Sequence, residues 1–160
     1  MLPTLLSPHF SLAEFIASQE ATRLGIDNTL PVALWGNAQE WAQMMERIRT
    51  AIAARLGHEV PILLTSGYRC LSLNRALKSD DTSDHVKAFA ADWSCPAFGT
   101  PTQIARFLAT QVDTLGIGQL INEYPDRNGW VHTSCNMVSK PINRIITITG
   151  HGTVAGIQEK

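Results

Sequence analysis

The longest regular pattern in this sequence is a run of apolar residues between Val32 and Leu56. Within it, apolar side chains recur every three or four positions, at Leu34, Ala38, Trp41, Met44, Met45, Ile48, Ile52 and Leu56. This spacing places them on one side of an α-helix, so the pattern predicts one long amphipathic helix. Gly57 follows, where a left-handed residue commonly ends a helix. We interpret the Trp41, Met44 and Met45 cluster as core rather than as a ligand-binding group.

Length and charge narrow the class of protein. A chain of 160 residues is expected to form one domain over residues 1–160, with a core of its own. The formal net charge of −1 argues against a protein that binds nucleic acid or an anionic membrane by bulk electrostatics. No apolar run approaches the roughly 18 residues of a membrane-spanning helix, so we expect no membrane insertion. There are no heptad repeats, so a monomer is expected.

Cysteine usage and the first residues indicate where the protein is made. Cys70, Cys95 and Cys135 are an odd number without CxxC spacing. They argue against a disulfide framework and a thiolate zinc site, and they fit a reducing cytoplasm. The segment from Met1 to Ser7 lacks the positive start and long apolar stretch of a signal peptide. We therefore expect synthesis in the cytoplasm.

The remaining segments predict a mixture of helices and strands. Short helices are expected from the Ser11–Glu14 capping box to about Gln19, over 71–77, and over 101–112. Strands are expected over 61–66, 89–93, 118–124, 130–134 and 142–149. The strands gather in the second half of the chain and are joined by turns. This order favours an α+β fold with a small antiparallel sheet flanked by helices.

Two histidines and one aspartate are candidates for chemistry. Asp92 lies in a predicted apolar strand, where a carboxylate is costly unless it is paired or bound to a cation. His85 precedes it by seven residues, and His132 lies in the strand predicted over 130–134. Two imidazoles and one carboxylate suffice for a zinc centre that keeps a fourth position for water. On spacing alone, a salt-bridged aspartate beside two core histidines remains the alternative.

A hydrolytic zinc site also needs a base that takes a proton from water and returns it to the leaving amine. Glu123 is the candidate, because it ends a predicted strand nine residues before His132 and a hairpin would bring the two together. A strand-end charge is the alternative reading of Glu123, and Asp126 is the alternative base. Arg69 is a natural cation for a substrate carboxylate or a developing oxyanion, unless it forms a structural ion pair.

Four motifs occur in order along the chain. They are Thr-Ser-Gly-Tyr-Arg from Thr65, Ser-Asp-His-Val-Lys-Ala-Phe-Ala-Ala-Asp from Ser83, Gln-Leu-Ile-Asn-Glu-Tyr from Gln119 and Trp-Val-His-Thr-Ser from Trp130. They resemble the zinc D-Ala-D-Ala carboxypeptidase family of peptidoglycan metallopeptidases. Within that family they look most like the group of phage endolysins and tail-associated murein peptidases. The resemblance extends over nearly the whole chain.

The resemblance implies a set of roles. One Zn²⁺ would be held by three ligands, His85, Asp92 and His132. Glu123 would be the catalytic base and acid, and Arg69 would be both catalytic and substrate-binding, through a substrate carboxylate or the oxyanion. Ser83 would form a hydrogen bond near the metal or the substrate. The fold would be the small α+β fold shared with the hedgehog signalling domain, with zinc on one face of an antiparallel sheet.

Two positions depart from the family pattern. Ala88 stands where the family has glycine, so a left-handed backbone there would be strained. Gly129, three residues before the last expected ligand, stands where several relatives place the catalytic acid. The second departure leaves the base to Glu123 or Asp126.

The expected function is therefore that of an endolysin-like zinc peptidase which cleaves peptidoglycan stem peptides or cross-links. Without a signal peptide, it would reach the wall, in the periplasm, through phage lysis machinery or as part of a virion. One alternative is a D,D-carboxypeptidase or dipeptidase that trims terminal D-Ala. The other is a catalytically silent zinc-binding module of the wall or virion, against which the presence of Glu123 and Arg69 argues.

Overall fold

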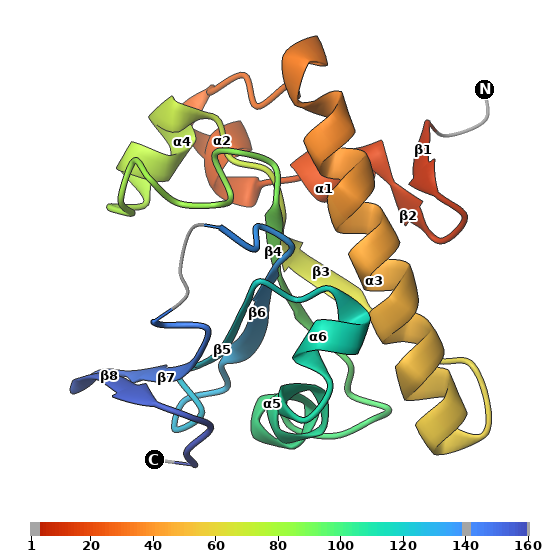
Figure 1. Ribbon diagram of the computed structural model, residues 1–160. Helices are drawn as coiled ribbons and strands as arrows, with labels where there is room; N and C mark the ends of the chain where they lie inside the picture. The colour runs from red at the N-terminus through yellow and green to blue at the C-terminus, as the bar shows by residue number, and fades with distance from the viewer. Residues whose placement is uncertain (1–3, 139–141, 160) are drawn as a thin grey trace.

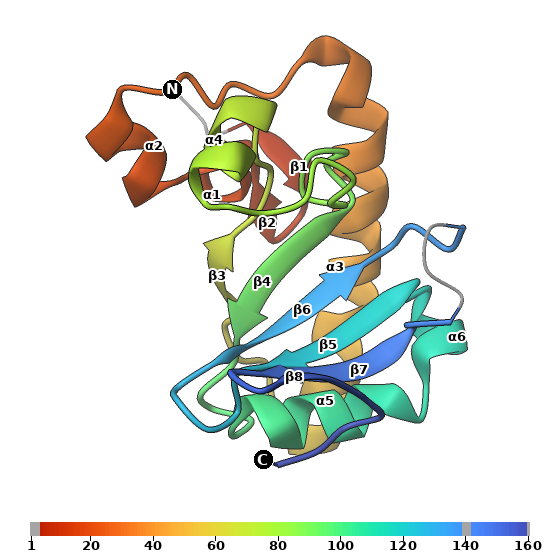
Figure 2. The same cartoon turned by 90° about the vertical axis from the view of Figure 1, so that its left-hand side faces the viewer.

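The computed structural model describes residues 4–138 and 142–159 of the chain. Its main sheet has six strands, which in chain order are β3 (Leu63–Ser66), β4 (Ala90–Ser94), β5 (Gln119–Glu123), β6 (Trp130–Ser134), β7 (Ile145–Thr149) and β8 (Gly152–Ala155). In space they lie in the order β3-β4-β6-β5-β7-β8. Helices α3 (Trp35–Leu56) and α5 (Pro101–Ala109) lie on one side of this sheet, and Figures 1 and 2 show that its other face stays open.

The other elements are short. They are β1 (Leu5–Ser7), β2 (Phe10–Ser11), α1 (Leu12–Ile16), α2 (Gln19–Leu24), the 3-10 turn η1 (Val32–Leu34), α4 (Leu71–Ala76) and α6 (Val112–Leu115). Helices α1, α2 and α4 gather beyond one end of the main sheet (Figure 2). None of the helices in the described part of the chain is long and apolar enough to cross a lipid bilayer.

The predicted helix boundaries are largely confirmed. Ser11 and Glu14 form the capping box of α1, and a second box opens α5. Gly57 ends α3 in the left-handed conformation, with φ of 81°. Helix α1 ends earlier than expected, at Ile16. It is followed by a second helix, α2, because the hydroxyl of Ser18 caps a new first turn.

The core lies between α3 and the sheet. The apolar face of α3 is fully buried, through Trp41, Met44, Met45, Ile48 and Ile52. The Thr133 hydroxyl on β6 donates to the Met45 sulfur at 3.6 Å, and the Phe15 ring stacks on Trp41 with centroids 4.1 Å apart. The aromatic and methionine cluster is therefore core, as predicted.

The sheet is larger than the small antiparallel sheet expected, and it is mixed. Strand β7 pairs with β5 in parallel, and β8 then pairs with β7 in antiparallel fashion. Strand β6 already has β4 on one edge and β5 on the other, so β7 does not pair with β6 and lies instead at the outer edge of β5. The α+β class is confirmed, but β8 has no buried residue and therefore no apolar pattern that could predict it.

Strand register assigns each side chain to one face. Neighbouring residues along a strand point to opposite faces, and residues directly opposite each other in paired strands share a face. Asp92 on β4 is opposite His132 on β6, and Glu123 on β5 is opposite Trp130. These four residues therefore share the open face. The residues between them, such as Trp93 and Val131, point into the core and are fully buried.

Ala88 has the left-handed backbone that the family glycine implies. Its φ is 59° and it is fully buried. We expect Ala88→Gly to change the free energy of unfolding by no more than about 1 kcal/mol, because relief of about 1–2 kcal/mol of backbone strain offsets the loss of a buried methyl group worth about 0.8 kcal/mol. Ala88→Val should lower it by about 2–4 kcal/mol, since a branched side chain tolerates neither this φ nor the closed space. Urea unfolding measures both changes, and a valine variant as stable as wild type would contradict the strain.

Candidate metal centre

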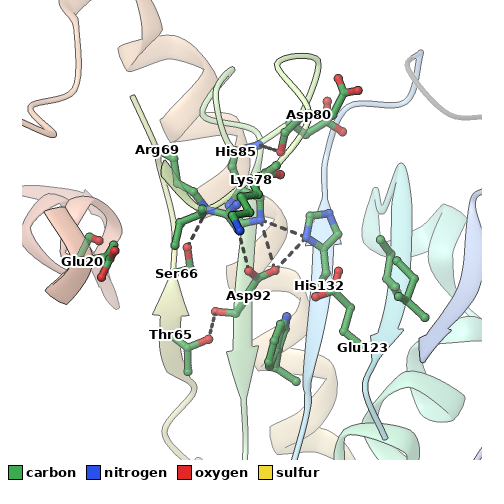
Figure 3. Close-up of a pocket in the computed structure, with 18 of the residues that line it drawn as sticks. Glu20, Thr65, Ser66, Arg69, Lys78, Asp80, His85, Asp92, Glu123 and His132 are labelled. Carbon is green, nitrogen blue, oxygen red and sulfur yellow. Dashed lines mark hydrogen bonds and ion pairs between the residues drawn. The ribbon is translucent and has the colours of Figure 1, made fainter. Parts of the chain in front are cut away.

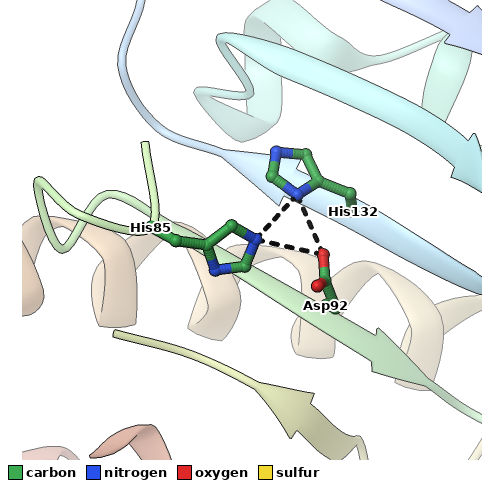
Figure 4. A group of neighbouring side chains, drawn as sticks. All are labelled: His85, Asp92 and His132. Carbon is green, nitrogen blue, oxygen red and sulfur yellow. Dashed lines mark hydrogen bonds and ion pairs between the residues drawn. The ribbon is translucent and has the colours of Figure 1, made fainter. Parts of the chain in front are cut away.

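Asp92, His85 and His132 converge on the open face of the sheet (Figure 4). Asp92 and His132 face each other across β4 and β6, and His85 reaches them from the loop before β4. Asp92 Oδ1 lies 2.9 Å from His132 Nδ1 and 3.3 Å from His85 Nε2. The two ring nitrogens lie 3.2 Å apart. One ligand atom from each residue thus lies within 4.8 Å of the other two.

The Asp92 carboxylate is buried and charged. Burial by itself would raise its pKa, but the charges and hydrogen bonds of His85 and His132 outweigh burial and hold the pKa well below the usual range. Only 5% of the residue is exposed. The expected burial of this charge is confirmed, and its stability depends on the groups around it.

Arg69 supports the second oxygen of Asp92. Its Nη2 donates to Asp92 Oδ2 at 3.0 Å. Its Nε donates to the Ser66 hydroxyl at 3.0 Å, and its Nη1 donates to Asn74 Oδ1 at 3.3 Å. Arg69 therefore forms the structural ion pair that the sequence left open as an alternative, and it does so at the edge of the candidate site.

The ring of His85 is oriented by the backbone of Gly67. His85 Nδ1 lies 2.7 Å from the Gly67 carbonyl oxygen, and a carbonyl oxygen only accepts. Nδ1 therefore carries a proton, and in the neutral ring Nε2 presents its lone pair to the site. Gly67 is required here because a Cβ would clash with the carbonyl oxygen of Phe15. Ser83 lies in the same loop as His85, and its hydroxyl oxygen accepts a hydrogen bond from the His85 amide at 3.3 Å.

The cluster fits a cation. His132 Nε2 is buried and has no hydrogen-bond partner among the described residues. If His132 Nδ1 donates to Asp92, the Nε2 lone pair is unpaired. If Nε2 is protonated instead, the Nδ1 lone pair faces a carboxylate oxygen and the lone pair of His85 Nε2. Either neutral form leaves a nitrogen unsatisfied, and two imidazoles with one carboxylate are donors that suit Zn²⁺.

A cleft of about 750 Å³ opens over this cluster (Figure 3). Its floor contains His85, Asp92 and His132, and one wall contains Glu123. The lining also includes the start of α2, around Ser18, and the loop that follows α4. The volume falls in the range of ordinary ligand pockets.

Glu123 reaches the cleft because β5 and β6 form the expected hairpin. It lies opposite Trp130, two residues from His132 on the same strand face. Burial raises the pKa of Glu123, and the nearby Asp92 carboxylate raises it further, although the charges of His132 and Arg69 oppose this. A carboxyl group with a raised pKa beside a candidate metal cluster is suited to take up and release a proton during a reaction.

The alternative base lies elsewhere. Asp126 is exposed in the turn between β5 and β6, 3.5 Å from Arg127, and it does not line the cleft. The same turn explains Gly129. A Cβ at Gly129 would clash with the carbonyl oxygens of Glu123 and Tyr124. In this chain the tight hairpin that presents Glu123 therefore excludes any side chain at position 129.

Sequence reasoning assigns no role to two buried polar residues at the site, Asn74 and Asp84. Asn74 accepts from Arg69 and donates to the Asp80 carbonyl at 2.8 Å, so it joins the arginine to the loop that carries His85. Asp84 accepts from the Ser134 hydroxyl at 2.6 Å, which ties that loop to β6. Asp84 lies in a polar stretch and Asn74 in a short helix, and in neither place does the local sequence distinguish the residue from a surface side chain.

Comparison with known proteins agrees with the geometry. Residues 8–134 match a family model described as Peptidase M15, which confirms the resemblance seen in the four motifs. A search of curated proteins finds no match. The match spans α1, α3, β3 to β6 and all three residues of the metal cluster.

The role of Gly129 can be tested by adding one methyl group. Gly129→Ala should lower the free energy of unfolding by about 2–4 kcal/mol, because the hairpin must open to admit a Cβ. Gly36→Ala is the matched control, since a Cβ there meets nothing within 4 Å. It lies in α3 and should be neutral or stabilising by up to about 1 kcal/mol. Urea unfolding measures the stability of both variants. Equal tolerance of alanine at the two positions would contradict the close approach of the Glu123 and Tyr124 carbonyl oxygens to Gly129.

Proposed function

The chain belongs to the peptidase M15 family, and on this premise we propose that it is a zinc metallopeptidase which hydrolyses an amide bond in peptidoglycan stem peptides or cross-links. The family is one of metallopeptidases, and the chain has a His-Asp-His cluster able to hold one metal ion. The observation that carries the proposal is that this cluster lies on the floor of a cleft whose wall contains the carboxyl group of Glu123.

His85, Asp92 and His132 would hold the zinc ion. When bound, zinc polarises a carbonyl group and lowers the pKa of water, which supplies a nucleophile at neutral pH. The protein contributes the positions of the ligands. The Gly67 carbonyl fixes the ring of His85, and Arg69 holds the second oxygen of Asp92. Such outer contacts set ligand orientation and metal affinity.

Glu123 would act as the base and then as the acid. Its carboxylate takes a proton from the attacking water and gives it to the leaving amine, so that an amide bond breaks with no net change in the enzyme. Its place opposite Trp130, on the face that carries His132, supports this role. The exposed position of Asp126 supports Glu123 over the alternative.

Arg69 and Ser83 would contact the substrate. Both line the cleft beside the metal cluster. The guanidinium can stabilise negative charge that grows on the scissile carbonyl oxygen, and the hydroxyl can donate to the peptide. The endolysin-like role, with action at the cell wall after phage-mediated release or from a virion, is supported by the four ordered motifs.

Digestion of purified peptidoglycan tests the proposal. Zinc-loaded protein should produce cut stem peptides, detected by mass spectrometry, and a chelated sample should not.

His132→Ala should lose both zinc and activity, because it removes a ligand. Glu123→Gln should retain zinc and lose about 10²–10⁴ in rate, the usual contribution of a general base.

Asp126→Asn is the matched control for Glu123→Gln, since each change replaces one carboxylate by its amide. It should leave the rate close to wild type. An inactive Asp126→Asn beside an active Glu123→Gln would show that the base is misassigned. Released D-Ala or D-Ala-D-Ala would favour the trimming enzyme. An unchanged wall with zinc bound would favour the silent module.

A further inference from the structure

Lys78 occupies a backbone position that ordinarily belongs to glycine. It lies two residues after the end of α4 at Ala76, and its φ is 56°. The Lys78 amide donates to the Arg75 carbonyl at 2.9 Å, and the Ser79 amide donates to the Asn74 carbonyl at 3.1 Å. These are the bonds that close a helix end with a left-handed residue, where the absence of a Cβ is an advantage. A lysine is strained at this position, and strain of this kind is often retained at functional sites.

The strained residue lines the candidate active-site cleft. Lys78 lines the same cavity as the metal cluster, and Figure 3 shows it among the labelled residues of the pocket. Most charged residues that line this cavity are acidic, namely Glu20, Asp80, Asp84, Asp92 and Glu123. Among the described residues of this lining, the basic side chains other than the two histidines are Arg69 and Lys78.

Arg69 and Lys78 differ in how many contacts their charged groups already make with the protein. The Arg69 guanidinium donates to Asp92, Ser66 and Asn74, and only 12% of its side chain is exposed. Lys78 is exposed, and it forms no ion pair with any residue in the described ranges. Its ammonium is therefore the positive charge of the cleft that a ligand can reach at the least cost in protein contacts.

We propose that Lys78 is a specificity-determining residue that binds a free carboxylate of the substrate peptide, away from the scissile bond. This inference rests on the proposed function, because peptidoglycan stem peptides carry such carboxylates and some walls carry them as amides. Amidation removes the charge but keeps the shape. A partly exposed charged hydrogen bond of this kind is expected to give about tenfold discrimination between the two forms.

Binding of a matched peptide pair tests this. A stem peptide with free carboxylates and the same peptide with those carboxylates amidated are titrated calorimetrically into the zinc-loaded protein. Wild type should bind the free form about tenfold more tightly. Lys78→Gly should bind both forms alike, and Lys78→Arg should retain the preference. In hydrolysis, the Lys78→Gly variant should show the loss in KM rather than in kcat, since the contact lies away from the reacting bond.

Thermal unfolding separates this role from a structural one. Lys78→Gly should raise Tm by about 2–4 °C, because it relieves the left-handed strain, while peptide preference is lost. Asn128→Gly is the matched control: Asn128 is also left-handed, with φ of 54°, but it lies outside the cleft lining. It should keep the full preference for the free carboxylate.

The outcomes distinguish the two proposals. A Lys78→Gly variant that keeps the preference overturns the role of Lys78, and so does a wild type that binds both peptides equally or binds neither. A wild type that prefers the free carboxylate but leaves peptidoglycan uncut overturns the hydrolytic function and leaves the role of Lys78 standing.

Discussion

A carboxylate buried on the face of a β-sheet is stable only where cations and hydrogen-bond donors surround it. Asp92 meets this condition because each of its two carboxylate oxygens has its own partners. One accepts from Arg69 at 3.0 Å, and the other faces the rings of His85 and His132. These partners come from the segment after β3, the loop before β4 and strand β6. The interactions that keep the charge in the sheet are therefore the same ones that bring the candidate metal ligands together.

The sequence indicates this centre because a charged residue in an apolar strand is energetically costly and therefore stands out. A charge inside an apolar strand pattern draws attention to Asp92, and the hairpin around residues 125–129 correctly places Glu123 beside the strand of His132. The pairing of β4 with β6 is different, since these strands are separated by α5, α6 and β5. The alternation of apolar and polar residues along a strand does not specify which distant strand it pairs with. The residue types alone make His85 and His132 candidate partners of Asp92, and the motif resemblance is what favours a zinc centre over a salt-bridged aspartate.

Other features depend on contacts that no local pattern records. Strand β7 pairs in parallel with β5, which ends about 20 residues earlier in the sequence, and β8 is exposed along its whole length. The two departures from the family pattern also have local causes. Ala88 takes the left-handed backbone of the glycine it replaces. Gly129 has no room for a side chain beside the carbonyl oxygen of Glu123. The absence of an acid at position 129 is thus linked to a hairpin that presents another one.

X-ray absorption at the zinc edge, on protein loaded with one equivalent of Zn²⁺ and then dialysed, tests the central claim most directly. The account predicts a retained ion with only nitrogen and oxygen neighbours at about 2.0–2.2 Å, together with the outer scattering of two imidazole rings. Loss of the ion on dialysis would contradict the account. So would a sulfur neighbour at about 2.3 Å, because it would place the metal at a cysteine rather than at Asp92 and its two histidines.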